Sequence, residues 1–234
     1  MDNSFILRIL ESCHMLNIEE EMNIYHLLSQ AVLLGVPGEV VELGCFDGRT
    51  AAIMQKTLDE LKSDKKLHLY DAFEGLPAPT EKDGDCLLVE GGCWTVPSEI
   101  PRIFRNAGLG DKLPLIHKGW FKDTLKNQLP DQICFAHLDG DMYTSIMESL
   151  ENVYPRLAKG AIVVIDDYCE PGLHKEIEEL INKNAYTIES SRKVKITDLA
   201  PGVKRACDEF LADKKEKVHV LISGEERQGF FRKE

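Results

Sequence analysis

The sequence predicts an α/β fold built on a mostly parallel β-sheet. Two apolar runs, ICFAHL at 133–138 and AIVVI at 161–165, flank a segment with helical spacing from Tyr143 to Leu157. Strand, helix and strand form the right-handed crossover unit of a parallel sheet, so both strands end at the same edge. EVVEL at 39–43, followed by a glycine-bearing turn and a helix, begins another such unit. Two strands near the end of the chain predict an antiparallel hairpin.

The remaining elements follow from apolar periodicity and turn residues. In chain order we expect two N-terminal helices within 1–34, a strand at 66–71, a helix at 98–109, a strand at 114–117 and helices at 173–184 and 201–214. Residues 77–97, rich in Gly, Pro and charge, form a candidate lid, because a loop of this length in a compact domain is usually functional. With no internal repeat and no linker, residues 1–234 predict a single domain.

Composition excludes several classes of function. The net charge of -12 argues against nucleic acid and against an anionic membrane surface as partners. No apolar run approaches the roughly 18 residues of a membrane span, and the N-terminus lacks the features of a signal peptide. Seven scattered cysteines without a C-x-x-C pair indicate reduced thiols. We therefore expect a cytoplasmic protein.

Four aspartates follow the two apolar runs at the predicted edge. Asp139 and Asp141 come after the first run, and Asp166 and Asp167 come after the second. Carboxylates this close repel one another unless a cation lies among them, and hard oxygen ligands suit Mg²⁺ or a similar divalent ion. Asp also caps helices and tolerates turns, which is the alternative for any one of them. The set as a whole predicts a metal site.

Glu42 and the turn that follows it predict a ligand site at the end of the 39–43 strand. The turn has the form E-x-G-x-x-x-G-x-T, which allows close ligand approach but is not the G-x-G-x-x-G dinucleotide fingerprint. A carboxylate near the end of a buried strand needs a cationic partner. That partner is either Arg49, in a structural ion pair, or a ligand ammonium.

Asp71 ends the next predicted strand, 23 residues after Gly48, where folds of this kind hold ribose hydroxyls. Phe73, two residues on, either covers an adenine or enters the core. Gly119 and Trp120 lie just past the predicted 114–117 strand and therefore at the same sheet edge. Together these positions predict a nucleoside site beside the metal site.

Seven blocks, GVPGEVVELGCFDGRTA, LYDAFEGLP, KGWFKDTL, LDGDMYTS, VVIDDY, PGVKRACDEF and GFFRK, resemble in this order the macrocin O-methyltransferase (TylF-like) family. The resemblance covers about residues 30–234. It implies an enzyme of secondary metabolism that uses S-adenosylmethionine and a divalent metal to methylate sugar hydroxyls. It also implies the class I methyltransferase Rossmann-like sheet of seven strands, the last antiparallel, with helices on both faces, and favours a homo-oligomer. About thirty residues, 170–199, are inserted relative to the family pattern.

The resemblance assigns roles to individual positions. The cofactor would be held by Glu42, Gly44, Phe46, Gly48, Thr50, Asp71, Ala72, Phe73, Gly119, Trp120 and Asp139. Asp139, Asp166 and Asp167 match the metal-binding positions, and Asp141 matches a proposed general base. His137 is our second candidate for the base, although a buried core histidine is the alternative reading of its place within a strand.

Three other functions remain open from the sequence. A catechol-type O-methyltransferase would share the metal but act on a phenol. A nucleoside-binding protein on the same fold would have no need of the four aspartates. A metal-dependent hydrolase would have no use for Glu42 and Asp71.

Overall fold

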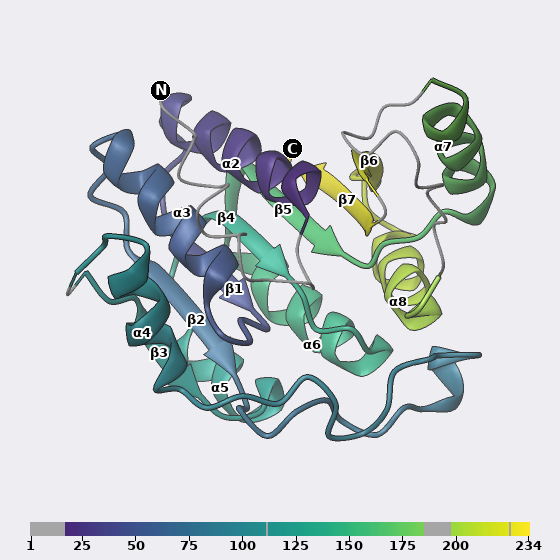
Figure 1. The fold of residues 1–234 in the computed structure, drawn as a ribbon, viewed down its shortest axis with the longest axis horizontal. Helices are drawn as coiled ribbons and strands as arrows, with labels where there is room; N and C mark the ends of the chain where they lie inside the picture. The colour runs from purple at the N-terminus through teal and green to yellow at the C-terminus, as the bar shows by residue number, and fades with distance from the viewer. Residues whose placement is uncertain (1–16, 111, 185–197, 225) are drawn as a thin grey trace.

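The computed structural model describes residues 17–110, 112–184, 198–224 and 226–234. Seven strands form one sheet in the order β3-β2-β1-β4-β5-β7-β6 (Figure 1). The strands are β1 (Glu39–Leu43), β2 (Leu67–Asp71), β3 (Leu115–Lys118), β4 (Ile133–Leu138), β5 (Leu157–Asp166), β6 (His219–Ser223) and β7 (Glu226–Arg232). The helices are α2 (Ile18–Leu33), α3 (Arg49–Glu60), α4 (Glu99–Asn106), α5 (Phe121–Gln128), α6 (Tyr143–Val153), α7 (Pro171–Asn184) and α8 (Pro201–Leu211), with 3₁₀ turns η1 (Glu81–Asp83) and η2 (Tyr154–Arg156).

Strand direction agrees with the predicted fold. The pairs β3–β2, β2–β1, β1–β4 and β4–β5 are parallel, whereas β7 runs antiparallel to both β5 and β6. The chain builds β1 to β3 outward in one direction and then returns to place β4 on the other side of β1. Open α/β sheets bind ligands at such a reversal, beyond the carboxyl ends of the strands. The prediction of an α/β sheet with its last strand antiparallel is confirmed.

Helices cover both faces of the sheet. On one face α3 contacts both α2 and α4, and on the other face α6 contacts both α5 and α8 (Figure 1). β4 is buried along its whole length, and the stretch of β5 from Ala161 to Ile165 is fully buried as well. Strands covered on both faces need no polar side, which explains why these two segments are continuous apolar runs.

The helix before the sheet is tied to the hairpin at the end of the chain. The Asn17 side chain accepts a hydrogen bond from the Glu20 backbone N–H at 2.8 Å, which caps α2. The same side chain donates to the carbonyl of Ser223 in β6 at 2.8 Å. The first turn of α2 therefore lies against the β6–β7 hairpin. The first of the two predicted N-terminal helices lies outside the described residues. So does the segment YTIES at 186–190, for which the sequence pattern also predicts a strand.

The composition predicts reduced cysteines and no membrane-spanning segment. Six of the seven cysteines fall in the described ranges, and all six are free thiols. Among the helices described, none is both long enough and apolar enough to cross a membrane.

Candidate active site

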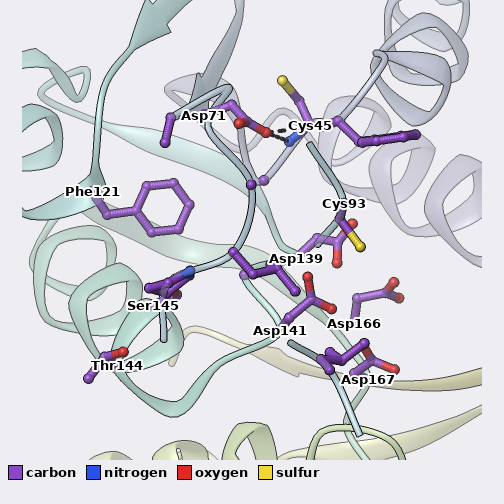
Figure 2. Close-up of a pocket in the computed structure, with 18 of the residues that line it drawn as sticks. Cys45, Asp71, Cys93, Phe121, Asp139, Asp141, Thr144, Ser145, Asp166 and Asp167 are labelled. Carbon is purple, nitrogen blue, oxygen red and sulfur yellow. Dashed lines mark hydrogen bonds between the residues drawn. The ribbon is translucent and has the colours of Figure 1, made fainter. Parts of the chain in front are cut away.

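The register of the central strands brings the predicted acidic residues to one edge. β4 pairs with β5 so that Leu138 lies opposite Ile165. Asp139 and Asp166 are the next residues along these two strands, so they leave the sheet side by side. Figure 2 shows the carboxylates of Asp139, Asp141, Asp166 and Asp167 grouped on one side of a cavity, and Asp71 at some distance on the other.

The cavity has a volume of about 880 Å³. Most of the predicted site residues line it, namely Glu42, Gly44, Phe46, Thr50, Asp71, Ala72, Trp120, Asp139, Asp141, Asp166 and Asp167. The described lining does not include Gly48, Phe73, Gly119 or His137. Phe73 is only 7% exposed and belongs to the hydrophobic core, so its side chain takes the second of the two places considered for it.

Asp71 organises the loops at one end of the cavity. Its Oδ2 accepts hydrogen bonds from the backbone N–H groups of Cys45 at 2.9 Å and Phe46 at 3.1 Å, and its Oδ1 accepts one from Phe73 at 2.7 Å. Phe46 and Phe73 both have left-handed φ angles, of 43° and 56°, which these bonds help to hold. A carboxylate oxygen has further lone-pair capacity, so Asp71 can also accept from a ligand hydroxyl.

Glu42 and His137 are register partners on β1 and β4, and both are buried. His137 Nδ1 lies 3.1 Å from Glu42 Oε1. Burial lowers the pKa of His137 and raises the pKa of Glu42, and the nearby charge of Asp71 raises the latter further. Glu42 Oε2 and His137 Nε2 have no hydrogen-bond partner among the described residues. Arg49, the structural partner considered for Glu42, forms an ion pair with Asp47 at 2.9 Å.

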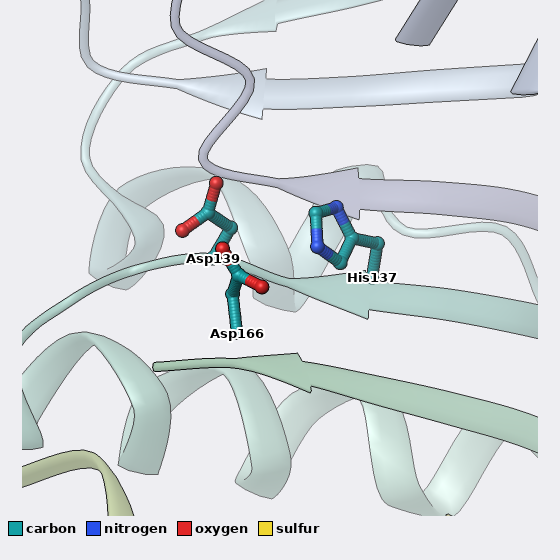
Figure 3. Close-up of side chains that lie close together, drawn as sticks. All are labelled: His137, Asp139 and Asp166. Carbon is teal, nitrogen blue, oxygen red and sulfur yellow. The ribbon is translucent and has the colours of Figure 1, made fainter. Parts of the chain in front are cut away.

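His137, Asp139 and Asp166 form a group with the composition of a metal site (Figure 3). Each offers one ligand atom, and these atoms lie within 4.8 Å of one another. Burial raises the pKa of Asp139, and the carboxylate of Asp166 raises it further. A histidine that ligates a metal usually directs its other ring nitrogen at a carboxylate, as His137 does toward Glu42. One nitrogen and two carboxylate ligands suit a divalent cation.

The other two aspartates face a different partner. Asp167, with a φ of 57°, pairs with Arg227 of β7, whose Nε lies 3.1 Å from Asp167 Oδ1. Asp141 has a φ of 59° and lines the cavity. Burial raises the pKa of Asp141, and the neighbouring Asp167 adds to the effect. The predicted metal ligands were Asp139, Asp166 and Asp167. Among the described residues, the group of close ligand atoms has His137 in place of Asp167.

Four residues at this edge were not predicted from the sequence. Glu20 and Glu21 enter from α2, and Arg227 and Gln228 enter from β7. Glu20 lines the cavity and shares a hydrogen bond with Asp166, to which Gln228 Nε2 also donates at 3.0 Å. Glu21 Oε1 accepts from Thr50 Oγ1 at 2.7 Å.

The spacing of apolar residues in α2 could have indicated Glu20. Acidic residues in the first turn of a helix are usually explained by the helix dipole. Glu20, however, precedes Ile24 and Leu28 by four and eight residues, so it lies on the apolar face that α2 buries. A carboxylate on that face has to meet another polar group inside the protein.

Comparisons with known proteins show the family to which this chain belongs. Residues 14–196 match the family model described as Macrocin-O-methyltransferase (TylF), a range that ends before the blocks PGVKRACDEF and GFFRK. The chain is 28% identical over 184 residues to mycinamicin III 3''-O-methyltransferase of Micromonospora griseorubida, with 75% of this chain and 72% of the relative aligned.

A second relative is 8-demethyl-8-(2,3-dimethoxy-alpha-L-rhamnosyl)-tetracenomycin-C 4'-O-methyltransferase of Streptomyces olivaceus. It is 32% identical over 174 residues, covering 68% of this chain and 66% of the relative. The solved structure of the O-methyltransferase NovP has a TM-score of 0.70 at 23% identity, over 93% of this chain and 80% of that one. The chain therefore belongs to the macrocin O-methyltransferase (TylF) family and is an O-methyltransferase that takes its methyl group from S-adenosylmethionine.

Proposed function

We propose that this chain methylates a hydroxyl group of a sugar or of a glycosylated small molecule. The observation that carries the proposal is a single cavity with Asp71 and the 44–50 loop at one end and the acidic group of β4 and β5 at the other. A nucleoside donor and a hydroxylic acceptor can meet between these ends. The two relatives are by name a 3''-O-methyltransferase of mycinamicin III and a 4'-O-methyltransferase of a rhamnosyl-tetracenomycin. The rhamnosyl group in the second name supports a sugar as the acceptor.

The residues of the first end fit S-adenosylmethionine. Asp71 would accept from the ribose hydroxyls, and the unpartnered Oε2 of Glu42 would accept from the methionine ammonium, since a buried carboxylate oxygen needs a donor. When bound, the cofactor supplies a methyl group already activated on a sulfonium. The chain then has to hold the acceptor oxygen in line at near-attack distance and exclude competing water.

The residues of the second end fit a divalent cation such as Mg²⁺. Asp139, Asp166 and His137 would hold it on the geometry described, and the family resemblance adds Asp167. Burial raises the pKa of Asp139, and repulsion from the neighbouring carboxylates, which a cation would relieve, raises it further. A bound cation would supply a Lewis acid that orients the acceptor hydroxyls.

Asp141 is the residue we assign as general base. It lines the cavity next to the acidic group, whereas His137 lies within β4 with Nδ1 against Glu42. A raised pKa brings a carboxylate closer to the range in which it takes up a proton near neutral pH. Asp141 would accept the proton of the acceptor hydroxyl as the methyl group is transferred.

Residues 77–97 would act as the lid on the acceptor side. Thr80, Leu88, Glu90 and Cys93 of this segment line the cavity. The segment thus forms one wall of the space in which the acceptor would lie, which suits a part that excludes water during transfer.

Calorimetric titration with S-adenosylhomocysteine, with and without Mg²⁺, tests the proposal first. We expect saturable binding at about one site per chain, in the micromolar range that corresponds to about -8 kcal/mol. A screen with labelled S-adenosylmethionine should then give methylated product with glycosylated acceptors and not with catechols. Binding without transfer to any sugar, or transfer to catechols alone, would contradict the proposed acceptor class.

A further inference from the structure

The helix that follows the proposed base is capped by a residue from a distant segment. α6 begins at Tyr143, and the side chain of its N-cap residue, Met142, makes no capping hydrogen bond with any described residue. Instead, Asp83 Oδ1 accepts the backbone N–H of Tyr143 at 2.6 Å. Asp83 is only 1% exposed and lies in η1, within the 77–97 segment. A buried carboxylate thus replaces the usual local cap, at the first residue of α6.

The same carboxylate holds its own segment together. Asp83 Oδ2 accepts the backbone N–H and the hydroxyl of Thr80, each at 2.7 Å. Thr80 lines the cavity, and Asp141 lines it two residues before Tyr143. One side chain therefore connects a wall of the cavity with the start of α6. Both oxygens of Asp83 are used, so neither contact can move without the other.

α8 closes this arrangement from a third direction. η1 lies beside α8 (Figure 1), and Leu87 donates its backbone N–H to the carbonyl of Leu199 at 3.0 Å. A Cβ atom at Gly202 would lie 2.3 Å from Asp83 Oδ1 and 3.0 Å from Tyr143 Cβ. Only glycine permits this approach. Together, these contacts form a clasp, which consists of Thr80, Asp83, Tyr143 and Gly202.

Charged groups surround the clasp at the surface. Lys82 Nζ lies 2.6 Å from Glu209 Oε2 of α8, and the hydroxyl of Tyr143 donates to the same oxygen at 2.7 Å. Exposed pairs of this kind contribute little stability each. Their arrangement nevertheless joins the same three parts of the chain, η1, α6 and α8, that the buried carboxylate joins.

We propose that Asp83 is a positioning residue for methyl transfer and that the Pro-Gly start of α8 exists to accommodate it. The clasp fixes the first turn of α6 and, through it, the backbone of Asp141, whose left-handed φ of 59° has to be held by its surroundings. It also holds the 77–97 segment against the acceptor space. Asp83 is not among the described residues that line the cavity, so we assign it no direct contact with donor or acceptor. The inference rests on the proposed function only for the role given to Asp141.

The chain contains a matched control for the test. α7 and α8 both begin with Pro-Gly, at 171–172 and at 201–202. A Cβ at Gly172 would have no described atom within 4 Å, whereas a Cβ at Gly202 would collide with Asp83. Gly172→Ala and Gly202→Ala are thus the same chemical change at the same helix position, and only the second reaches the clasp.

Three quantities are measured on the full chain. They are kcat with an acceptor that the wild-type chain methylates, affinity for S-adenosylhomocysteine, and the rate of hydrogen exchange of the Tyr143 amide. In Gly202→Ala we expect kcat to fall at least tenfold, the affinity to stay within threefold of wild type, and the amide to exchange at least tenfold faster. Asp83→Ala should match it, and Gly172→Ala should match wild type. If Gly202→Ala does not fold, Thr80→Val serves as a milder variant. It removes one hydrogen-bond donor to Asp83 and changes no charge, and we expect kcat to fall two- to fivefold.

Two results would overturn the inference. Unchanged exchange of the Tyr143 amide in Asp83→Ala would show that no clasp exists. Faster exchange with kcat within twofold of wild type would show that the clasp does not position the base. Failure of the proposed function would be seen separately. A wild-type chain that neither binds S-adenosylhomocysteine nor methylates any acceptor would remove the role given to Asp141. The exchange rate of the Tyr143 amide would still decide whether the clasp exists.

Discussion

The two ends of the cavity present aspartates at the same edge of the same sheet in opposite surroundings. Asp71, at the end of β2, accepts three backbone N–H groups, from Cys45, Phe46 and Phe73. Asp139, at the end of β4, has the carboxylate of Asp166 as its main charged neighbour, and burial together with that charge raises its pKa. One carboxylate is surrounded by donors and the other by like charge.

The difference shows what each end is built to receive. A carboxylate held by backbone donors is stable as an anion without a ligand, and it can still accept from a neutral hydroxyl. Carboxylates that raise one another's pKa gain most from a cation placed among them. The first end therefore suits a ribose, and the second suits a metal ion. Substitutions that remove charge should have opposite effects on stability at the two ends.

Asp166→Asn should have the largest effect of these substitutions. We expect turnover to fall at least about a hundredfold, since even residues that only orient a metal ligand typically cost 10–100-fold when they are lost. Affinity for S-adenosylhomocysteine should stay within about threefold. The free energy of unfolding of the metal-free protein at pH 8 should not fall, because the substitution removes a buried charge while Gln228 can still donate to the remaining oxygen.

Product formation by mass spectrometry and urea unfolding in the presence of a chelator measure these quantities. Asp131→Asn, at an exposed position, is the control for the loss of one negative charge. A clear loss of stability in Asp166→Asn would show that hydrogen-bond donors satisfy the Asp166 side chain, as they do that of Asp71, and the contrast between the two ends would disappear.

Asp71→Asn should act in the opposite direction on stability and less strongly on turnover. An amide has one acceptor oxygen, so at least one of the three backbone N–H groups would face an NH₂ group. We expect the free energy of unfolding of the ligand-free protein to fall by about 1–3 kcal/mol. The dissociation constant of S-adenosylhomocysteine should rise at least about tenfold, because a charge-assisted hydrogen bond contributes about 1.5–3 kcal/mol. Calorimetry and urea unfolding give both numbers, and equal stability of variant and wild type would count against a structural role for this carboxylate.

The fold could be predicted because its strongest signals are local. β4 and β5 are continuous apolar runs because helices cover both faces of the sheet, and the crossover rule then sets their direction. The acidic residues of the site were found for a related reason. Asp71, Asp139 and Asp166 each end a strand or follow one directly, and the carboxyl edge of a parallel sheet is where such residues meet.

The rest of the site depends on contacts between segments far apart in the sequence. Arg227 and Gln228 reach Asp167 and Asp166 because β7 pairs antiparallel with β5, and a terminal strand gives no sign of such partners. Asp83, in a loop without periodicity, caps a helix that starts sixty residues later. His137 shows the same limit, since its pairing with Glu42 follows from the register of β1 and β4.

Glu21 allows the same contrast to be measured through pH, with a smaller effect. Burial raises its pKa from an ordinary 4.5 to about 8, against the lowering effect of the Thr50 hydroxyl. Between these pH values the folded state retains a proton that the unfolded state has released, so the free energy of unfolding falls as pH rises, by at most about 1.4 kcal/mol per pH unit.

Glu21→Gln does not titrate, and its amide oxygen can still accept from Thr50. We expect the stability of the variant relative to wild type to increase steadily from pH 5 to pH 8 in chelator-treated protein, as measured by urea unfolding. Glu19→Gln, in the same turn of α2, controls for overall charge. Parallel curves for Glu21→Gln and wild type would mean that Glu21 does not retain its proton in the folded state over this range, and would contradict the raised pKa.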